Sequence, residues 1–258
     1  MKIKYAAIKP IGSQQPKAYA DICAHTNDVY RETGNLFQKW HFATTCPQDI
    51  FHQHFGSVDV MTSAHETTHQ INSEIANSNG GRAKNVGLYL LNDVGFTVDE
   101  PSGFTIQTVA SKVPQEFRGG ICQVYDLYLV KQAASWGDRP MYLLDEWVAY
   151  TNGAIAALQM AQAGDGDTNR WSEIQNAIYF NMFCSVAYSM KPNAELLELC
   201  LYNLARVNQT FTAGNKIASL QRAETDTLLQ KYYASEFYKP FAELHPEKLL
   251  DWGFEGYL

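Results

Sequence analysis

The sequence contains no long apolar run: nowhere do its 258 residues approach the ~20 consecutive apolar residues that a membrane-spanning helix needs. Its first residues also lack the apolar core of a secretory signal, because Met1–Tyr5 leads almost directly into Pro10 and Gly12. We therefore expect a protein without a membrane span, which is cytoplasmic or, if the sequence is truncated, secreted.

Basic residues are scarce, since 20 Lys and Arg stand against 27 Asp and Glu, and the formal net charge is −7. No stretch forms the basic stripe that a nucleic-acid-binding surface requires. Charged residues make up 18% of the chain, whereas 46% is hydrophobic and 13% aromatic. This composition excludes a disordered, collagen-like or coiled-coil chain, and it predicts a globular protein that does not bind nucleic acid.

Closely spaced cysteines are missing as well. The five cysteines are widely spread and contain no Cys-x-x-Cys pair: Cys23, Cys46, Cys122, Cys184 and Cys200. A secreted disulfide scaffold would be shorter and richer in cysteine. We expect free thiols that pack as small apolar residues.

The first half of the chain mixes helical and strand patterns. A helix is expected over 60–78, because Asn79-Gly80-Gly81 supplies residues that accept the left-handed conformation at which helices end. The apolar run at 86–91 predicts a strand. A Pro-Gly turn between two further apolar runs predicts a hairpin over 96–109. Before these elements, residues 17–40 carry a loose helical period.

From about residue 120 the pattern is helical nearly to the end. Helices are expected near 121–135, 140–163, 168–190, 194–212 and 217–239. The predicted fold class is therefore α+β and predominantly α-helical, with a small β-sheet or hairpin in the first half. We expect two regions, 1–163 and a helical subdomain at 164–258 packed on it, or one continuous domain.

One pentapeptide, His65-Glu66-Thr67-Thr68-His69, forms an H-E-x-x-H motif. Because residues four apart share one face of a helix, both imidazoles can reach a single ion from the same side. Glu66 follows His65 by about 100° around the helix axis, so its carboxylate borders that face without having to bind the ion. From there it can accept a proton from a metal-bound water. Zinc suits nitrogen and oxygen ligands and needs no redox change.

A structural alternative uses the same glutamate. Ser63 and Glu66 form a Ser-x-x-Glu capping box, which would leave the two histidines merely exposed at the start of a helix. Asp59 is an equally good cap and would place the pentapeptide a full turn inside the helix. We favour the metal site, because the helix also has few large apolar residues on its histidine side.

The pentapeptide resembles the zincin zinc metallopeptidases, and the resemblance rests on His65, Glu66 and His69. It implies a zincin-like catalytic core in the first region, one Zn²⁺ ion bound by the two histidines, Glu66 as general base, and a peptide or protein substrate. The metzincin branch is excluded, because its longer motif requires Gly and His where this chain has Asn72 and Ile75.

A catalytic zinc takes three protein ligands and keeps one position for water or substrate. In the glutamate branch of the zincins, the gluzincins, the third ligand is a Glu on a second helix. Glu146 is the best candidate, because an acidic pair in an apolar helix is costly to bury unless it finds a cation or a hydrogen-bond partner. Small residues in this helix would let it approach the histidine helix closely: Ala149, Gly153, Ala154 and Ala157.

The resemblance covers two short segments and identifies no family. Glu146 lies 77 residues after His69, farther than in the thermolysin-like and aminopeptidase-like families. Tyr150 also stands where thermolysin-like enzymes carry an Asp that orients a zinc histidine. Asp145, or a histidine of the pair His52 and His54, remains an alternative third ligand. In a further alternative, Asp145 and Glu146 simply open a helix, where acidic residues suit the positive end of the helix dipole.

Peptide hydrolysis also needs a donor that stabilises the oxyanion. Tyr150, one turn past Glu146, is the candidate, with Tyr142 one turn before Glu146 as a second choice. The structural alternative is a core tyrosine with a bonded hydroxyl. An extended substrate could pair with an edge strand, for which the hairpin at 96–109 is one candidate.

The sequence therefore supports two hypotheses. In the first, the protein is a zinc-dependent hydrolase, specifically a metallopeptidase, in which Glu66 activates a zinc-bound water. In the second, it is a non-catalytic α-helical binding protein with an accidental or vestigial motif. In that case, the aromatic-rich helix at 171–188 would offer a partner surface, although the same residues also fit a buried core.

Overall fold

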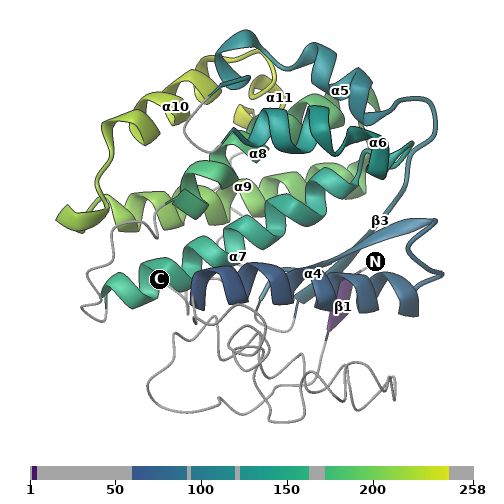
Figure 1. Cartoon of the computed structure of the whole chain (residues 1–258), viewed down its shortest axis with the longest axis horizontal. Coiled ribbons are helices and arrows are strands. Elements are labelled where there is room, and N and C mark those ends of the chain that lie inside the picture. Colours follow the sequence, from purple (N-terminus) through teal and green to yellow (C-terminus); the bar gives the residue numbers. More distant parts are fainter. Residues whose placement is uncertain (1, 5–59, 92–93, 120–122, 163–171, 244–258) are drawn as a thin grey trace.

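The computed structural model of the protein describes residues 2–4, 60–91, 94–119, 123–162 and 172–243. Within these residues the fold is α+β and predominantly α-helical, as the sequence predicts (Figure 1). The helical pattern at 17–40 and the candidate ligands His52 and His54 lie outside the described residues. None of the helices in the described ranges is long and apolar enough to cross a membrane.

Three antiparallel strands form the sheet, in the order β1-β3-β2. They are β1 (Lys2–Lys4), β2 (Asn85–Tyr89) and β3 (Val94–Asp99). In the register of β2 and β3, Val86 lies opposite Val98 and Leu88 lies opposite Phe96. The strand predicted at 86–91 is confirmed as far as Tyr89, and the first arm of the hairpin predicted over 96–109 lies in β3, which pairs with it.

The hairpin predicted over 96–109 is wrong in its second arm. Residues 106–112 form a helix, α5 (Ile106–Lys112), whose N-cap is Thr105 in a capping box with Thr108. Ile106, Val109 and Ala110 are buried, and this i, i+3, i+4 spacing is that of one helix face. The turn after β3 therefore leads into a helix, and the segment offers no edge strand, because β3 itself lies between β1 and β2.

Helix α4 (Val60–Ser78) carries the pentapeptide and ends as predicted. Gly80 and Gly81 have positive φ angles of 107° and 94°, which glycine adopts without strain. Because α4 begins at Val60, Ser63 lies inside the helix, and the capping box of Ser63 with Glu66 is wrong. Glu66 is thus free of a capping role.

Strand β2 packs very closely on α4. A Cβ atom at Gly87 would lie 2.5 Å from the backbone nitrogen of Ala76, a distance that atoms in a folded protein do not tolerate. Only glycine lets the strand approach the helix this far, so Gly87 fixes the position of β2 beside the histidine helix.

The second half contains three long helices, each near its predicted position: α7 (Tyr142–Gln162), α8 (Ser172–Met190) and α9 (Ala194–Gly214). Two predicted helices are broken. Within the described part of the segment predicted at 121–135, a π-helix, η2 (Tyr125–Lys131), is followed by the short α6 (Ala133–Trp136). The segment 217–239 splits because Arg222 and Ser235 are extended, which leaves η4 (Ala218–Leu220), α10 (Ala223–Ala234) and α11 (Lys239–Ala242).

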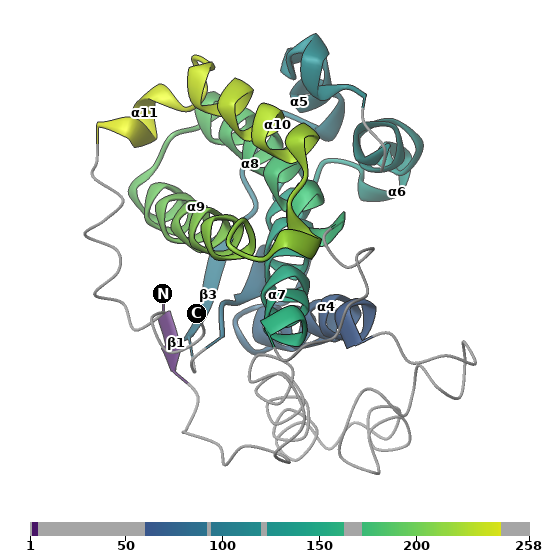
Figure 2. The same ribbon diagram turned by 90° about the vertical axis from the view of Figure 1, so that its left-hand side faces the viewer.

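Helix α7 is the centre of the molecule. It packs against α4 and β2 on one side and against α8 and α9 on the other (Figures 1 and 2). Residues 143–158 are all buried, and one hydrophobic cluster includes residues from both sides of the predicted boundary between 163 and 164. The apolar residues of α8 lie in this cluster, including Ile174, Ile178 and Phe183, so they form core rather than a partner surface.

Two cysteines fall within the described residues, and both are as expected. Cys184 and Cys200 are free thiols, and both are buried. Burial raises the pKa of each thiol, so both stay protonated and pack as small apolar groups.

Candidate metal centre

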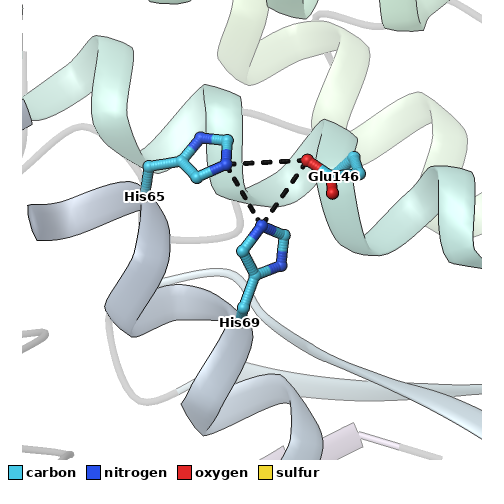
Figure 3. A group of neighbouring side chains, drawn as sticks. All are labelled: His65, His69 and Glu146. Atoms are coloured by element: carbon cyan, nitrogen blue, oxygen red, sulfur yellow. Dashed lines mark hydrogen bonds and ion pairs between the residues drawn. The ribbon is translucent and has the colours of Figure 1, made fainter. Parts of the chain in front are cut away.

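The two histidines of α4 and Glu146 of α7 converge at one point (Figure 3). Their Nε2 atoms lie 3.1 Å apart. The Oε2 atom of Glu146 lies 3.6 Å from Nε2 of His65 and 3.5 Å from Nε2 of His69. Because the two histidines are four residues apart, both rings lie on the side of α4 that faces α7. Glu146 lies one turn after the start of α7. The three side chains predicted to bind zinc are therefore neighbours.

Burial makes this arrangement costly without a cation. His65 is 6% exposed and Glu146 is 4% exposed. Among the described residues, the buried Oε2 of Glu146 makes no hydrogen bond, and its partners are the two histidine nitrogens at ion-pair distance. A buried carboxylate oxygen is strongly disfavoured unless it is paired. Two imidazole nitrogens and one such oxygen within 4.8 Å of one another form a donor set that fits one divalent cation such as zinc.

The other nitrogen of each histidine faces a carboxylate. Nδ1 of His65 lies 3.2 Å from Oε2 of Glu173, which comes from the first turn of α8. Nδ1 of His69 lies 3.0 Å from Oδ1 of Asp145. A carboxylate at Nδ1 favours the Nδ1–H tautomer and leaves the lone pair on Nε2. Both rings are thus oriented to offer Nε2 to the same ion.

Asp145, the alternative third ligand, does not lie with the three convergent donor atoms. It lies on the far side of His69 and accepts a hydrogen bond of 2.6 Å from the side-chain amide of Asn72. Asn72 is held in turn by the backbone N–H of Tyr89, which donates to its Oδ1 atom over 2.6 Å. Asp145 lies in the first turn of α7, where the helix dipole favours an acid, and both Asp145 and Glu146 are buried.

The charges in this cluster shift the pKa values of its members. Burial lowers the pKa of His65, but the close approach of Glu146 and Glu173 outweighs burial and raises it to about 9. For His69, burial is likewise outweighed by Asp145 and Glu146, which raise its pKa. Burial raises the pKa of Glu146, but both histidines outweigh it and lower the pKa to about 2. Without a metal, protons thus take the place of the cation.

Glu66 lies beside the cluster and is exposed. It is not one of the three grouped side chains, and its role as a base stays a prediction. Burial raises the pKa of Tyr142, and so do the negative charges of Glu146, Asp145 and Glu66. The Glu66 carboxylate is therefore close enough to act electrostatically on the rim of the centre.

Both candidate tyrosines lie against the histidines. The Tyr150 ring stands edge-on to His65, with ring centroids 4.3 Å apart, and its hydroxyl is 2.7 Å from the hydroxyl of Tyr128. The Tyr142 ring is stacked parallel to His69 at 6.5 Å. Burial, together with the charge of Glu146, raises the pKa of Tyr128, so its hydroxyl stays protonated near the centre.

Sequence reasoning missed three residues of the centre: Glu173, Asn72 and Tyr128. Glu173 carried a usable signal, since it is an acid at the start of an apolar helix, as Glu146 is. Asn72 lies seven residues after His65, two turns along the same helix face, but a lone asparagine at such a position points to no particular role. Tyr128 carried no signal that set it apart from the other tyrosines.

Comparison with family models finds no match, and neither the curated proteins nor the solved structures give one. The resemblance to the zincins rests on His65, Glu66 and His69, with Glu146 as the expected third ligand. The geometry adds the convergence of three donor atoms and a carboxylate behind each imidazole.

Proposed function

We propose that this protein is a zinc-dependent hydrolase that cleaves peptide bonds, with His65, His69 and Glu146 as the zinc ligands. The observation that carries the proposal is the orientation of the two rings. Both Nε2 atoms point at the buried Oε2 of Glu146, while both Nδ1 atoms face carboxylates. Histidines that bind zinc typically have such a carboxylate behind the ring, because it sets the tautomer and raises the basicity of the ligand nitrogen.

The donor set suits zinc chemistry. Two imidazoles and one carboxylate leave one of the four tetrahedral positions for water or substrate, as in catalytic zinc sites. When bound, zinc lowers the pKa of a coordinated water and polarises a carbonyl group. The protein's part is to hold the three ligands, to exclude competing ligands and to move the proton.

Glu66 is the proposed base. Its exposed carboxylate follows His65 directly, so it borders the ligand face and remains open to substrate. In the proposed reaction, Glu66 takes a proton from the attacking water as the water oxygen bonds to the peptide carbonyl carbon. It then gives this proton to the amine nitrogen as the C–N bond breaks. General acid–base catalysis of this kind contributes about 10²–10⁴-fold to the rate.

Tyr150 is the proposed donor to the developing oxyanion, with Tyr128 as its partner. The two hydroxyls lie 2.7 Å apart. To donate its proton to a substrate oxygen, the Tyr150 hydroxyl would exchange one of its present contacts for the substrate. Since Tyr150 already contacts the His65 ring, this donor would lie beside the ligand face.

The test is metal analysis followed by hydrolysis of unstructured peptides by the zinc-loaded protein, with cleavage followed by mass spectrometry. We expect one zinc per chain and cleavage that a chelator abolishes. Glu66→Gln should keep the zinc but lose at least about 10²-fold in turnover. Glu195→Gln, at an exposed position of α9, is the matched control and should behave like the unmodified protein. A fully active Glu66→Gln variant would overturn the mechanism, and a protein without stoichiometric zinc would favour the binding-protein hypothesis.

A further inference from the structure

One face of α7 lies beside the His65 ring. Glu146, Tyr150 and Gly153 are spaced by four and three residues, so they lie on the same side of the helix. Glu146 faces Nε2 of His65 at 3.6 Å, and Tyr150 covers the ring. Gly153 adjoins the third neighbour of the ring, Glu173.

Glu173 reaches His65 from the other half of the chain. It lies in the first turn of α8, 108 residues after His65, and it is only 8% exposed. Its Oε2 atom is the atom that faces Nδ1 of His65 at 3.2 Å. Among the contacts of the His65 ring, this oxygen is the one that faces Nδ1.

Gly153 provides the space for that oxygen. A Cβ atom at position 153 would lie 2.7 Å from Oε2 of Glu173, and 3.4 Å from both its Cδ atom and the carbonyl oxygen of Met61. The first distance is shorter than any ordinary contact of a carbon with an oxygen. Oε2 is the end of a flexible side chain and can move, so an alanine here would displace the carboxylate before it disturbed the fold.

Glycine is otherwise a poor choice at this point of the molecule. Residue 153 lies in the middle of a buried 21-residue helix, where alanine stabilises the helix more than glycine does. Three of the next four residues are alanines: Ala154, Ala156 and Ala157. The space that the carboxylate needs is a physical reason for glycine at 153.

We propose that Gly153 is a positioning residue of the metal centre, which leaves room for Glu173 to hold His65 by Nδ1 and so turns Nε2 toward Glu146. The inference rests on the proposed function for the identity of the ion. Its consequence is that zinc affinity depends on a residue that touches neither the metal nor its ligands. It also makes α8 part of the centre.

The test is a double-mutant cycle with Gly153→Ala, Glu173→Ala and the double variant. Zinc affinity is measured by competition with a chelator of known affinity, and Glu173→Gln is added as the conservative variant. We expect Glu173→Ala to lower the affinity about 10–100-fold, as loss of such a partner does, and Glu173→Gln to lower it less. Gly153→Ala should lower the affinity at least about 5-fold alone, and it should add nothing in the Glu173→Ala background.

Gly119→Ala is the matched control, since a Cβ there meets no atom within 4 Å, and it should leave the zinc affinity unchanged. Circular dichroism and thermal unfolding of the metal-free variants establish that each is folded. The proposal is overturned if Gly153→Ala binds zinc like the unmodified protein. It is also overturned if this substitution lowers the affinity equally in both backgrounds, because Gly153 would then act through the packing of α7 beside Met61.

A second readout does not need the metal. In ¹⁵N NMR spectra of the metal-free protein, the signal of the His65 Nδ1 atom should report its hydrogen bond to Glu173. This signal should shift in the same direction in Gly153→Ala and in Glu173→Ala, and a Gly153→Ala spectrum identical to that of the unmodified protein would overturn the proposal. If the shift occurs while no variant binds zinc, the proposed function fails and the positioning role stands.

Discussion

Two buried polar clusters lie on α7, and their central groups, the Asn152 amide and the Glu146 carboxylate, differ in how completely their hydrogen bonds are satisfied. In the first, around Asn152, both ends of the amide are used. Its nitrogen donates to Thr68 over 3.1 Å and to the carbonyl of Tyr89 over 3.0 Å, and its oxygen accepts from Arg206. This cluster joins α4, β2, α7 and α9 with the groups that the chain itself supplies.

The second cluster, the metal centre, begins less than two turns earlier on the same helix. Three carboxylates and two imidazoles meet there, and Oε2 of Glu146 makes no hydrogen bond within the described residues. The comparison teaches that buried polarity by itself does not indicate a site. An amide whose hydrogen bonds are made by the chain, such as that of Asn152, holds the fold together, whereas a buried carboxylate oxygen beside convergent donor atoms supports the proposal of a metal site.

The largest expected effect is that of zinc on stability. Zinc at 1,000 times its dissociation constant should raise the free energy of unfolding by about 4 kcal/mol, because it binds only the folded chain. Glu146→Ala should remove most of this gain. Urea unfolding with and without zinc measures both quantities. An equal zinc effect in Glu146→Ala would show that the ion binds elsewhere, and the contrast between the two clusters would fail.

Asn152→Ala should cost about 3 kcal/mol of unfolding free energy, since it leaves the Arg206 guanidinium and the Tyr89 carbonyl without this buried partner. The loss should be the same with and without zinc, because the first cluster needs no ligand. Urea unfolding at an unchanged m-value measures it. Gln107→Ala, at an exposed position of α5, is the control. If zinc restored the unfolding free energy lost in Asn152→Ala, the two clusters would be energetically coupled rather than separate.

The metal-free protein should lose stability as the pH rises from about 6.5 to 9. The pKa of His65 is raised in the folded chain to about 9, so its contribution is fully present below the unfolded-state pKa of 6.5 and disappears as the pH passes 9. The expected loss is about 3 kcal/mol, since each pKa unit between the folded and unfolded chain is worth about 1.4 kcal/mol. With zinc bound this loss should vanish, since the ion replaces the proton. Urea titrations across this pH range test the prediction, and a flat metal-free profile would contradict it.

The smallest expected effect is that of Asp145→Asn, about tenfold in zinc affinity. Asparagine keeps an acceptor for His69 but removes the charge that favours the Nδ1–H tautomer. Chelator competition measures the change, with Asp226→Asn at an exposed site of α10 as the control. If Asp145 coordinated the metal directly, Asp145→Asn would instead lower the zinc affinity far more than tenfold.

Much of the candidate metal centre could be predicted because the arrangement of its residues is local. The spacing of His65 and His69 and the end of α4 at Gly80 follow from helix geometry and from the conformational freedom of glycine. Glu146 was predictable because an acid in an apolar helix needs a partner. The helix at 106–112 was not, since its β-branched residues also fit a strand, and only the Thr105 cap and the buried face of Ile106 and Val109 decide between the two.

By itself, the sequence determined that two imidazoles share one helix face, because the period of a helix is a property of its backbone. Only the tertiary structure decided which carboxylate meets which nitrogen: Glu146 at Nε2, Glu173 and Asp145 at Nδ1. These contacts join segments up to 108 residues apart and depend on how closely α4, α7 and α8 approach. That approach is set by the packing of many side chains at once, and at one point by the absence of a side chain at Gly153.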